Sequence, residues 1–136
     1  MDHADHVHLL EDGIPARGGT WADLGSGTGA FTLALAELIG PQGRIYSVEK
    51  QPGRLEQQKR AFSARTNVVH PPDMRYLQAD FTQELEIPAL DGIVMANALH
   101  FFRDKQTVIR HVRGFLKPDG RFILVEYNVE RGNPWV

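Results

Sequence analysis

Short apolar runs alternate with amphipathic stretches along most of this chain, and this alternation limits the fold more than any other feature. The runs with the composition of buried strands are 20–24, 44–48, 74–79, 91–96 and 121–127. The stretches with helical spacing or helix-start residues are 2–12, 30–39, 52–65 and 104–116. Strands that alternate with helices form parallel sheets. The sequence therefore predicts an α/β fold, a doubly wound parallel sheet in the order 3-2-1-4-5 with helices on both faces.

The bulk properties restrict the class of protein further. The length of 136 residues fits one domain, residues 1–136. A formal net charge of -2 argues against nucleic acid held by bulk electrostatics. Basic residues do gather in the helix predicted over 52–65, where a solvated face is the simpler interpretation and RNA contact the alternative; they are Arg54, Lys59, Arg60 and Arg65.

The chain has no cysteine, which excludes disulfides, thiolate metal sites and a cysteine nucleophile. No apolar run approaches the roughly 18–20 residues that a membrane span needs. The chain opens with acidic and polar residues rather than the basic and then apolar opening of a signal peptide, so we expect a cytoplasmic protein. The same opening holds His3, His6 and His8, for which a polar terminus is a better explanation than a metal cluster. No metal is predicted.

Polar residues stand at the ends of four different predicted strands, and a glycine loop follows the first of them. These residues are Asp23, Glu49, Asp80 and Asn97, and the loop runs over 25–29. In an open parallel sheet, ligands bind at the carboxyl ends of the strands, near the point where the strand order reverses. Capping a helix is an equally good explanation for Asp80 alone. The four together predict one crevice.

Four segments resemble class I S-adenosylmethionine-dependent methyltransferases, which have a Rossmann-like sheet. Residues 21–29 (WADLGSGTG) are similar to the first motif of that family, and 77–81 (LQADF) to the motif after the third strand. Residues 91–101 and 108–120 resemble the ubiquinone/menaquinone and type 11 group. The resemblance covers about residues 6 to 127. Family members usually continue beyond the fifth strand with a helix and an antiparallel strand pair, which this sequence lacks.

The resemblance implies S-adenosyl-L-methionine as cofactor and S-adenosyl-L-homocysteine as product. It implies that Glu49 accepts hydrogen bonds from both ribose hydroxyls, that Asp80 accepts from the adenine amino group, and that Asp23 holds the methionine amino group. The full implied cofactor-binding set is Asp23, Gly25, Ser26, Gly27, Gly29, Glu49, Lys50, Asp80, Phe81 and Asn97. Residues 1–19 would form an N-terminal helix or lid, and 128–136 a tail.

The implied reaction is in-line methyl transfer to a small-molecule acceptor. His100, just past the fourth strand, is the best-placed base for a hydroxyl acceptor, and packing or shaping the pocket is its alternative role. Other functions stay open at this stage, among them a non-catalytic cofactor-binding subunit and an RNA methyltransferase. A nicotinamide-dependent dehydrogenase fits less well, because Asp23 would lie beside pyrophosphate and the glycine spacing differs from G-x-G-x-x-G.

The fifth predicted strand is apolar on both faces, as in a strand that is covered on both sides. At an open edge such a strand invites aggregation. We therefore expect either that the chain is a fragment of a longer enzyme or that a second copy covers this edge in a homodimer.

Overall fold

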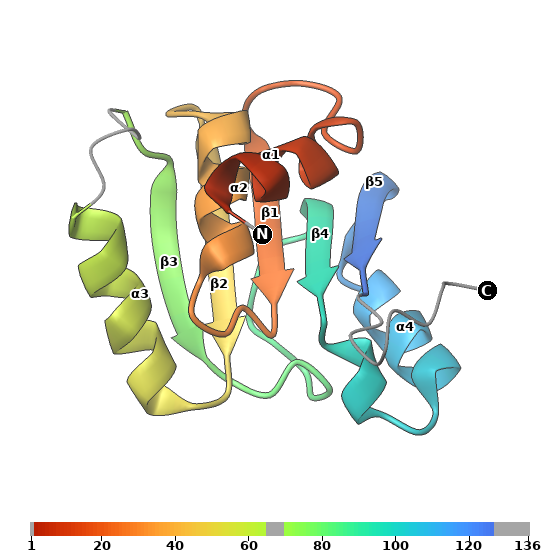
Figure 1. Cartoon of the computed structure of the whole chain (residues 1–136). Helices are drawn as coiled ribbons and strands as arrows, with labels where there is room; N and C mark the ends of the chain where they lie inside the picture. The colour runs from red at the N-terminus through yellow and green to blue at the C-terminus, as the bar shows by residue number, and fades with distance from the viewer. Residues whose placement is uncertain (1, 65–69, 127–136) are drawn as a thin grey trace.

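The computed structural model describes residues 2–64 and 70–126. Its helices are α1 (His3–Glu11), α2 (Ala30–Ile39), α3 (Pro52–Ala64), the 3-10 turn η1 (Leu99–Phe101) and α4 (Lys105–Arg113). Its strands are β1 (Gly19–Leu24), β2 (Gly43–Glu49), β3 (Asp73–Gln78), β4 (Leu90–Ala96) and β5 (Leu116–Val125). All neighbouring strands pair in parallel, in the order β3-β2-β1-β4-β5. The predicted fold class and strand order are confirmed (Figure 1).

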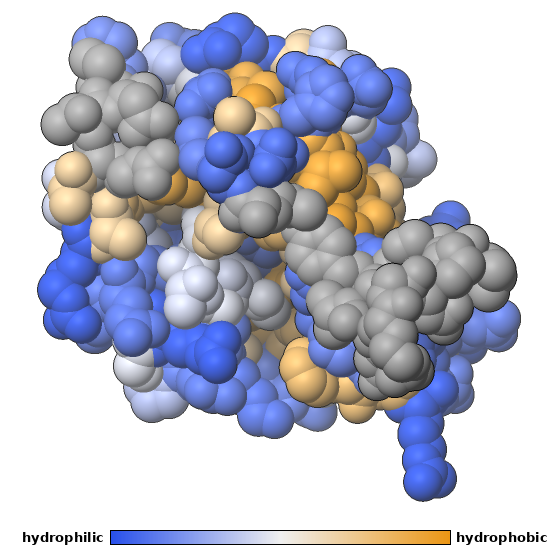
Figure 2. All heavy atoms as spheres, in the orientation of Figure 1, coloured by the Kyte–Doolittle hydropathy of each residue, from blue (hydrophilic) through white to orange (hydrophobic). Residues whose placement is uncertain are grey.

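Helices lie on both faces of the sheet. On one face, α1 and α2 pack on the middle strands around Leu10, Leu35 and Ile39, all fully buried, and α3 adds Phe62 at the rim. On the other face, α4 contributes Val108 and Val112 to a second core. The chain between β3 and β4 has no helix, and its apolar residues pack onto that second core directly. Hydrophilic side chains cover most of the face of the molecule that carries α2 (Figure 2). Apolar atoms show on the same face between α1 and β5.

The chain after α4 differs from the prediction. The helix predicted over 104–116 ends at Arg113, and the strand predicted to begin at Arg121 begins at Leu116. The predicted turn over 117–120 lies inside β5 as an irregularity, because Leu90 pairs with Leu116 and Gly92 pairs with Arg121. Tertiary pairing with β4 therefore overrides local turn chemistry. The last predicted strand residue, Tyr127, lies outside the described residues, as do Arg65 and the tail over 128–136.

The acidic opening of the chain has a structural role. The Asp2 side chain accepts from the Asp5 N–H and the Asp5 side chain accepts from the Asp2 N–H, a capping box that satisfies the start of α1. His3 lies 2.8 Å from Glu37 on α2, so the histidines of α1 have partners other than a metal. Within residues 2–64 and 70–126, no group of three or more side chains is arranged to hold a metal ion. None of the helices there is long and apolar enough to cross a membrane.

Candidate functional site

The glycine loop is held at the carboxyl ends of β1 and β2. Leu24 is in register with Val48, so the two strands end side by side. The N–H groups of Gly25 and Ser26 both donate to the Val48 carbonyl, at 2.9 and 3.0 Å. The loop therefore turns tightly over the end of β2, before α2 begins at Ala30.

Gly25 has no room for a side chain. Its φ is +73°, a conformation that favours glycine. A Cβ at this position would lie 3.1 Å from the Phe81 ring and 3.2 Å from the Ala98 methyl group. Segments that follow β1, β3 and β4 thus meet at one point, as the sequence predicts for a shared crevice.

Glu49 binds the same loop from the end of β2. Its Oε1 accepts from the Gly27 N–H at 2.8 Å, and its Oε2 accepts from the Gln51 N–H at 3.0 Å. The residue is 8% exposed. Each carboxylate oxygen has a second lone pair, so Glu49 can accept two further hydrogen bonds while its orientation stays fixed.

Asp23 is a buried acid beside Glu49. It is 1% exposed, and its Oδ2 accepts from the Thr32 hydroxyl at 2.7 Å. Burial raises the pKa of this carboxyl to about 7, the Thr32 hydrogen bond opposes the rise, and the negative charge of Glu49 adds to it. A cation bound near Asp23 would favour its ionised form.

Asp80 closes a turn after β3. Its Oδ1 accepts from both the N–H and the hydroxyl of Thr82, at 2.9 and 2.6 Å, and these bonds lower the pKa of the carboxyl. The charge of Lys50 also lowers this pKa, which places Lys50 in electrostatic reach of Asp80. The neighbouring Phe81 is 9% exposed and packs edge-on against Phe102. Among the described residues no helix directly follows Asp80, so the helix-capping role considered for it is wrong, and its carboxylate closes a turn instead. A role in ligand binding stays a prediction.

The segment after β4 is attached to the end of β5. Asn97 has a positive φ of 57°, and its N–H donates to the Val125 carbonyl at 2.7 Å. The Leu99 N–H donates to Oε2 of Glu126 at 3.1 Å, and Nδ1 of His100 lies 3.3 Å from Oε1 of the same carboxylate. His100 is half exposed. Sequence reasoning missed Glu126, whose only signal is its place directly after β5.

Two other polar residues near the loop, Gln58 and Ser47, were not predicted. Gln58 of α3 is 4% exposed, and it contacts Ser26, Gly27 and the buried Ser47 of β2. An isolated glutamine in a charged helix carries no sequence signal of burial. The only hint was its spacing of three from Leu55, the other buried residue of α3.

The arrangement suits a ligand with hydroxyl groups and a positive charge. Carboxylates of Asp23 and Glu49 lie within electrostatic reach of each other at adjacent strand ends, and a carboxylate is purely an acceptor when it is ionised. The loop is more open at Gly27, where, among the described residues, a Cβ would meet only Arg54 within 4 Å, at 3.5 Å, so a ligand can approach the backbone there. The structure thus brings most of the predicted cofactor-binding residues together at the carboxyl ends of the strands. His100 lies in η1, the short 3-10 turn that follows β4.

Comparison with known proteins identifies the family to which the chain belongs. The family described as "Methyltransferase domain" matches residues 22–122. The hybrid PKS-NRPS synthetase lepA of Aspergillus flavus is 31% identical over 114 residues, which are 79% of this chain and 3% of that protein. A demethylmenaquinone methyltransferase of Symbiobacterium thermophilum is 30% identical over 106 residues, 76% of this chain and 41% of that protein.

The fold has close counterparts among solved structures. A SAM-dependent methyltransferase from Aquifex aeolicus superposes with a TM-score of 0.77 at 17% identity, over 97% of this chain and 69% of that one. The chain spans less than half the length of either curated relative.

Proposed function

This chain belongs to the methyltransferase domain family, and from that premise we propose that it binds S-adenosylmethionine and transfers the methyl group to a small-molecule acceptor. The observation that carries the proposal is the 2.8 Å hydrogen bond from the Gly27 N–H to Glu49 Oε1, which joins the glycine loop to the acid at the end of β2. It presents a carboxylate with unused lone pairs at the edge of a surface lined by glycine.

The residues present fit this cofactor. Glu49 accepts from the two ribose hydroxyls, since both its oxygens are already oriented by backbone N–H groups. Asp23 offsets the positive charge of the methionine portion, and the glycine loop lies beneath that portion. Asp80 and the Phe81 N–H bind the adenine edge, and Asn97 binds the amino group through its carbonyl. Ser26, Gly29 and Lys50 complete the set.

Bound S-adenosylmethionine supplies a methyl group on a positively charged sulfur, which an acceptor takes by in-line displacement. His100 accepts the proton of a hydroxyl acceptor through Nε2, because Glu126 lies against Nδ1 and favours the tautomer with its proton there. Glu126 itself is held by the Leu99 N–H. Most of the acceleration comes from positioning, whose effective molarity reaches about 10⁵–10⁸ M in favourable cases.

Calorimetry on the purified chain tests the proposal. We expect S-adenosylmethionine and S-adenosylhomocysteine to bind at a single site and a nicotinamide dinucleotide not to bind. A methyl-release assay with small phenols, quinone precursors, amines and RNA then tests transfer. Absence of S-adenosylhomocysteine binding would contradict the proposal, and binding without transfer to any acceptor would favour a non-catalytic subunit.

Replacing Glu126 with glutamine is expected to lower the methyl-transfer rate to a hydroxyl acceptor at least about 100-fold, within the range that general bases contribute. The new amide donates to Nδ1 of His100, while its oxygen still accepts from Leu99, so the proton moves to Nε2 and the base is lost. His100→Gln should lose as much.

Glu11→Gln is the matched control, because Glu11 pairs with His8 at 2.9 Å on α1. It should leave the rate unchanged, and all three variants should bind S-adenosylhomocysteine as the unaltered chain does. An E126Q protein with full activity on a hydroxyl acceptor would show that the pair has no catalytic role.

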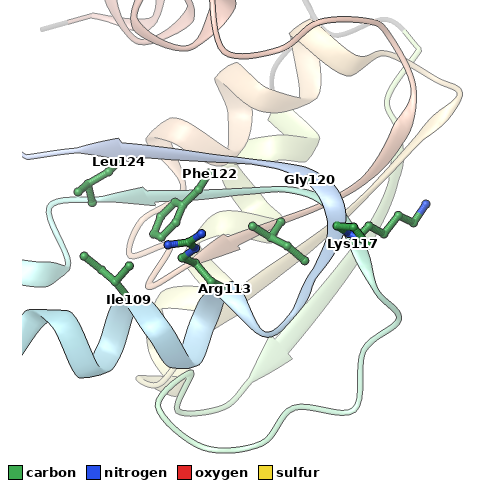
Figure 3. Close-up of a pocket in the computed structure, with 8 residues that line it drawn as sticks. Ile109, Arg113, Lys117, Gly120, Phe122 and Leu124 are labelled. Atoms are coloured by element: carbon green, nitrogen blue, oxygen red, sulfur yellow. The ribbon is translucent and has the colours of Figure 1, made fainter.

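A homodimer that covers β5 is part of the same proposal, as is a cytoplasmic location for a chain without cysteine. Leu124 is 45% exposed, and a groove of about 510 Å³ lies between α4 and β5, where Phe122 and Leu124 face Ile109 and Arg113 (Figure 3). We expect sedimentation to show a dimer and Leu124→Lys to shift it to monomer, because a charge at an edge strand opposes pairing. A stable monomer of the unaltered chain would contradict this.

A further inference from the structure

Gln58 lies under the glycine loop, and its side-chain amide bonds to that loop and to β2. We propose that Gln58 is a positioning residue for cofactor binding, which holds Ser26 and Gly27 in the conformation that directs the Gly27 N–H at Glu49. This inference rests on the proposed function, since it assigns a residue to the same site.

Both N–H donors of the Gln58 amide are used. Its Nε2 donates to the Gly27 carbonyl at 2.6 Å and to the Ser26 hydroxyl at 2.8 Å, and its Oε1 accepts from the Ser47 hydroxyl at 2.6 Å. The Gly27 carbonyl can only accept, so the end of the amide that faces it must be the nitrogen. The amide orientation is therefore determined by its surroundings, in a side chain that is 4% exposed.

The loop needs such support because its glycines restrict its backbone conformation little. Gly25, Gly27 and Gly29 all have positive φ, and glycine reaches many other conformations at low cost. Gly27 is held from two sides, by Glu49 at its N–H and by Gln58 at its carbonyl. A Cβ on Gly29 would lie 2.8 Å from Gln58 Cγ, so the side chain also fits closely against the end of the loop.

The burial of Gln58 favours a functional explanation over a general packing role. Leu55 and Gln58 are the buried residues of α3, so this helix uses one of its few core positions for a polar side chain. An apolar residue there would contribute hydrophobic stabilisation without requiring hydrogen-bond partners. The glutamine instead provides the two donors that the loop requires.

The test is Gln58→Met, which keeps the length of the side chain and removes both donors. We expect its affinity for S-adenosylhomocysteine, measured by calorimetry, to fall about 10-fold, as the loss of two neutral hydrogen bonds predicts. Without ligand, hydrogen exchange at the Gly27 amide should accelerate about 10-fold as well. Gln58→Glu is the second variant if the methionine protein does not fold, because it preserves the shape and places an oxygen against the Gly27 carbonyl.

Leu55→Ala is the control on the same helix, expected to lower the melting temperature while affinity and Gly27 exchange stay unchanged. The inference is overturned if the Gln58 variants stay within about twofold of the unaltered chain in both measurements, or if L55A matches their loss of affinity. Failure of the unaltered chain to bind S-adenosylhomocysteine would overturn the proposed function, and the exchange measurement would then decide separately whether Gln58 holds the glycine loop.

Discussion

Replacing Glu49 with alanine is expected to weaken S-adenosylhomocysteine binding by about 100-fold or more. Hydrogen bonds to a charged group contribute about 1.5–3 kcal/mol each, and the ribose diol would lose two of them at this carboxylate. The melting temperature should change much less, since the Gly27 and Gln51 N–H groups that Glu49 accepts from in the structure are only partly buried. Calorimetry and thermal unfolding of the same samples measure the two effects.

Asp73→Ala provides the matched control for Glu49. Asp73 is also a carboxylate with two partners, Arg44 and Arg75. It is the first residue of β3, so it lies at the amino end of the strands, whereas Glu49 lies at their carboxyl end. Its loss should leave binding unchanged. If the Glu49 variant lost its affinity together with a comparably large fall in melting temperature, Glu49 would instead have a purely structural role.

Replacing Asp23 with asparagine is expected to stabilise the folded chain above about pH 7, even though it weakens binding of the cationic cofactor. The folded state holds the Asp23 proton up to a pKa of about 7, against a pKa of 3.8 for an unperturbed aspartate. The folded chain therefore binds more protons between these limits, so its stability falls as pH rises from about 4 to about 7. Asparagine does not titrate, so the variant does not lose stability in this way as pH rises.

The stability difference between the asparagine variant and the unaltered chain should be near zero at pH 4 and reach at most about 4 kcal/mol above pH 7, by conversion of the pKa rise. Urea unfolding at a series of pH values measures it. Asp91→Asn should show the opposite sign, because hydrogen bonds from the Thr20 N–H and Lys117 lower the pKa of Asp91. A D23N protein less stable than the unaltered chain at pH 8 would contradict the prediction.

The pH dependence of cofactor binding also follows from Asp23. A carboxyl that is protonated near neutral pH in the free protein must ionise to hold a cation, so cofactor affinity should rise as pH increases from about 5 to about 8. The buried acid thus costs stability in the free state and contributes binding energy when a cation lies beside it. Such opposition between stability and function is common at ligand sites.

Local sequence was sufficient to predict the sheet and the convergence of polar residues at its carboxyl edge. The apolar runs and the breakers between them define five strands, and parallel order follows from the handedness of crossovers. Because the carboxyl ends of parallel strands share one edge, the residues after those strands had to converge. Asp23 and Glu49 could be predicted for this reason, although nothing in the sequence indicates that Asp23 is buried enough to raise its pKa.

Only the tertiary structure decided which further side chains contact the glycine loop and the segment after β4. Gln58 and Glu126 reach the site from elements that are distant in the sequence, and neither belongs to a local pattern that would mark it. The start of β5 was likewise set by pairing with β4, which turned a local Pro-Asp-Gly turn into an irregularity within a strand. Hydrophobic period and turn chemistry act over a few residues, whereas hydrogen bonds between side chains on separate elements exist only once the chain has folded.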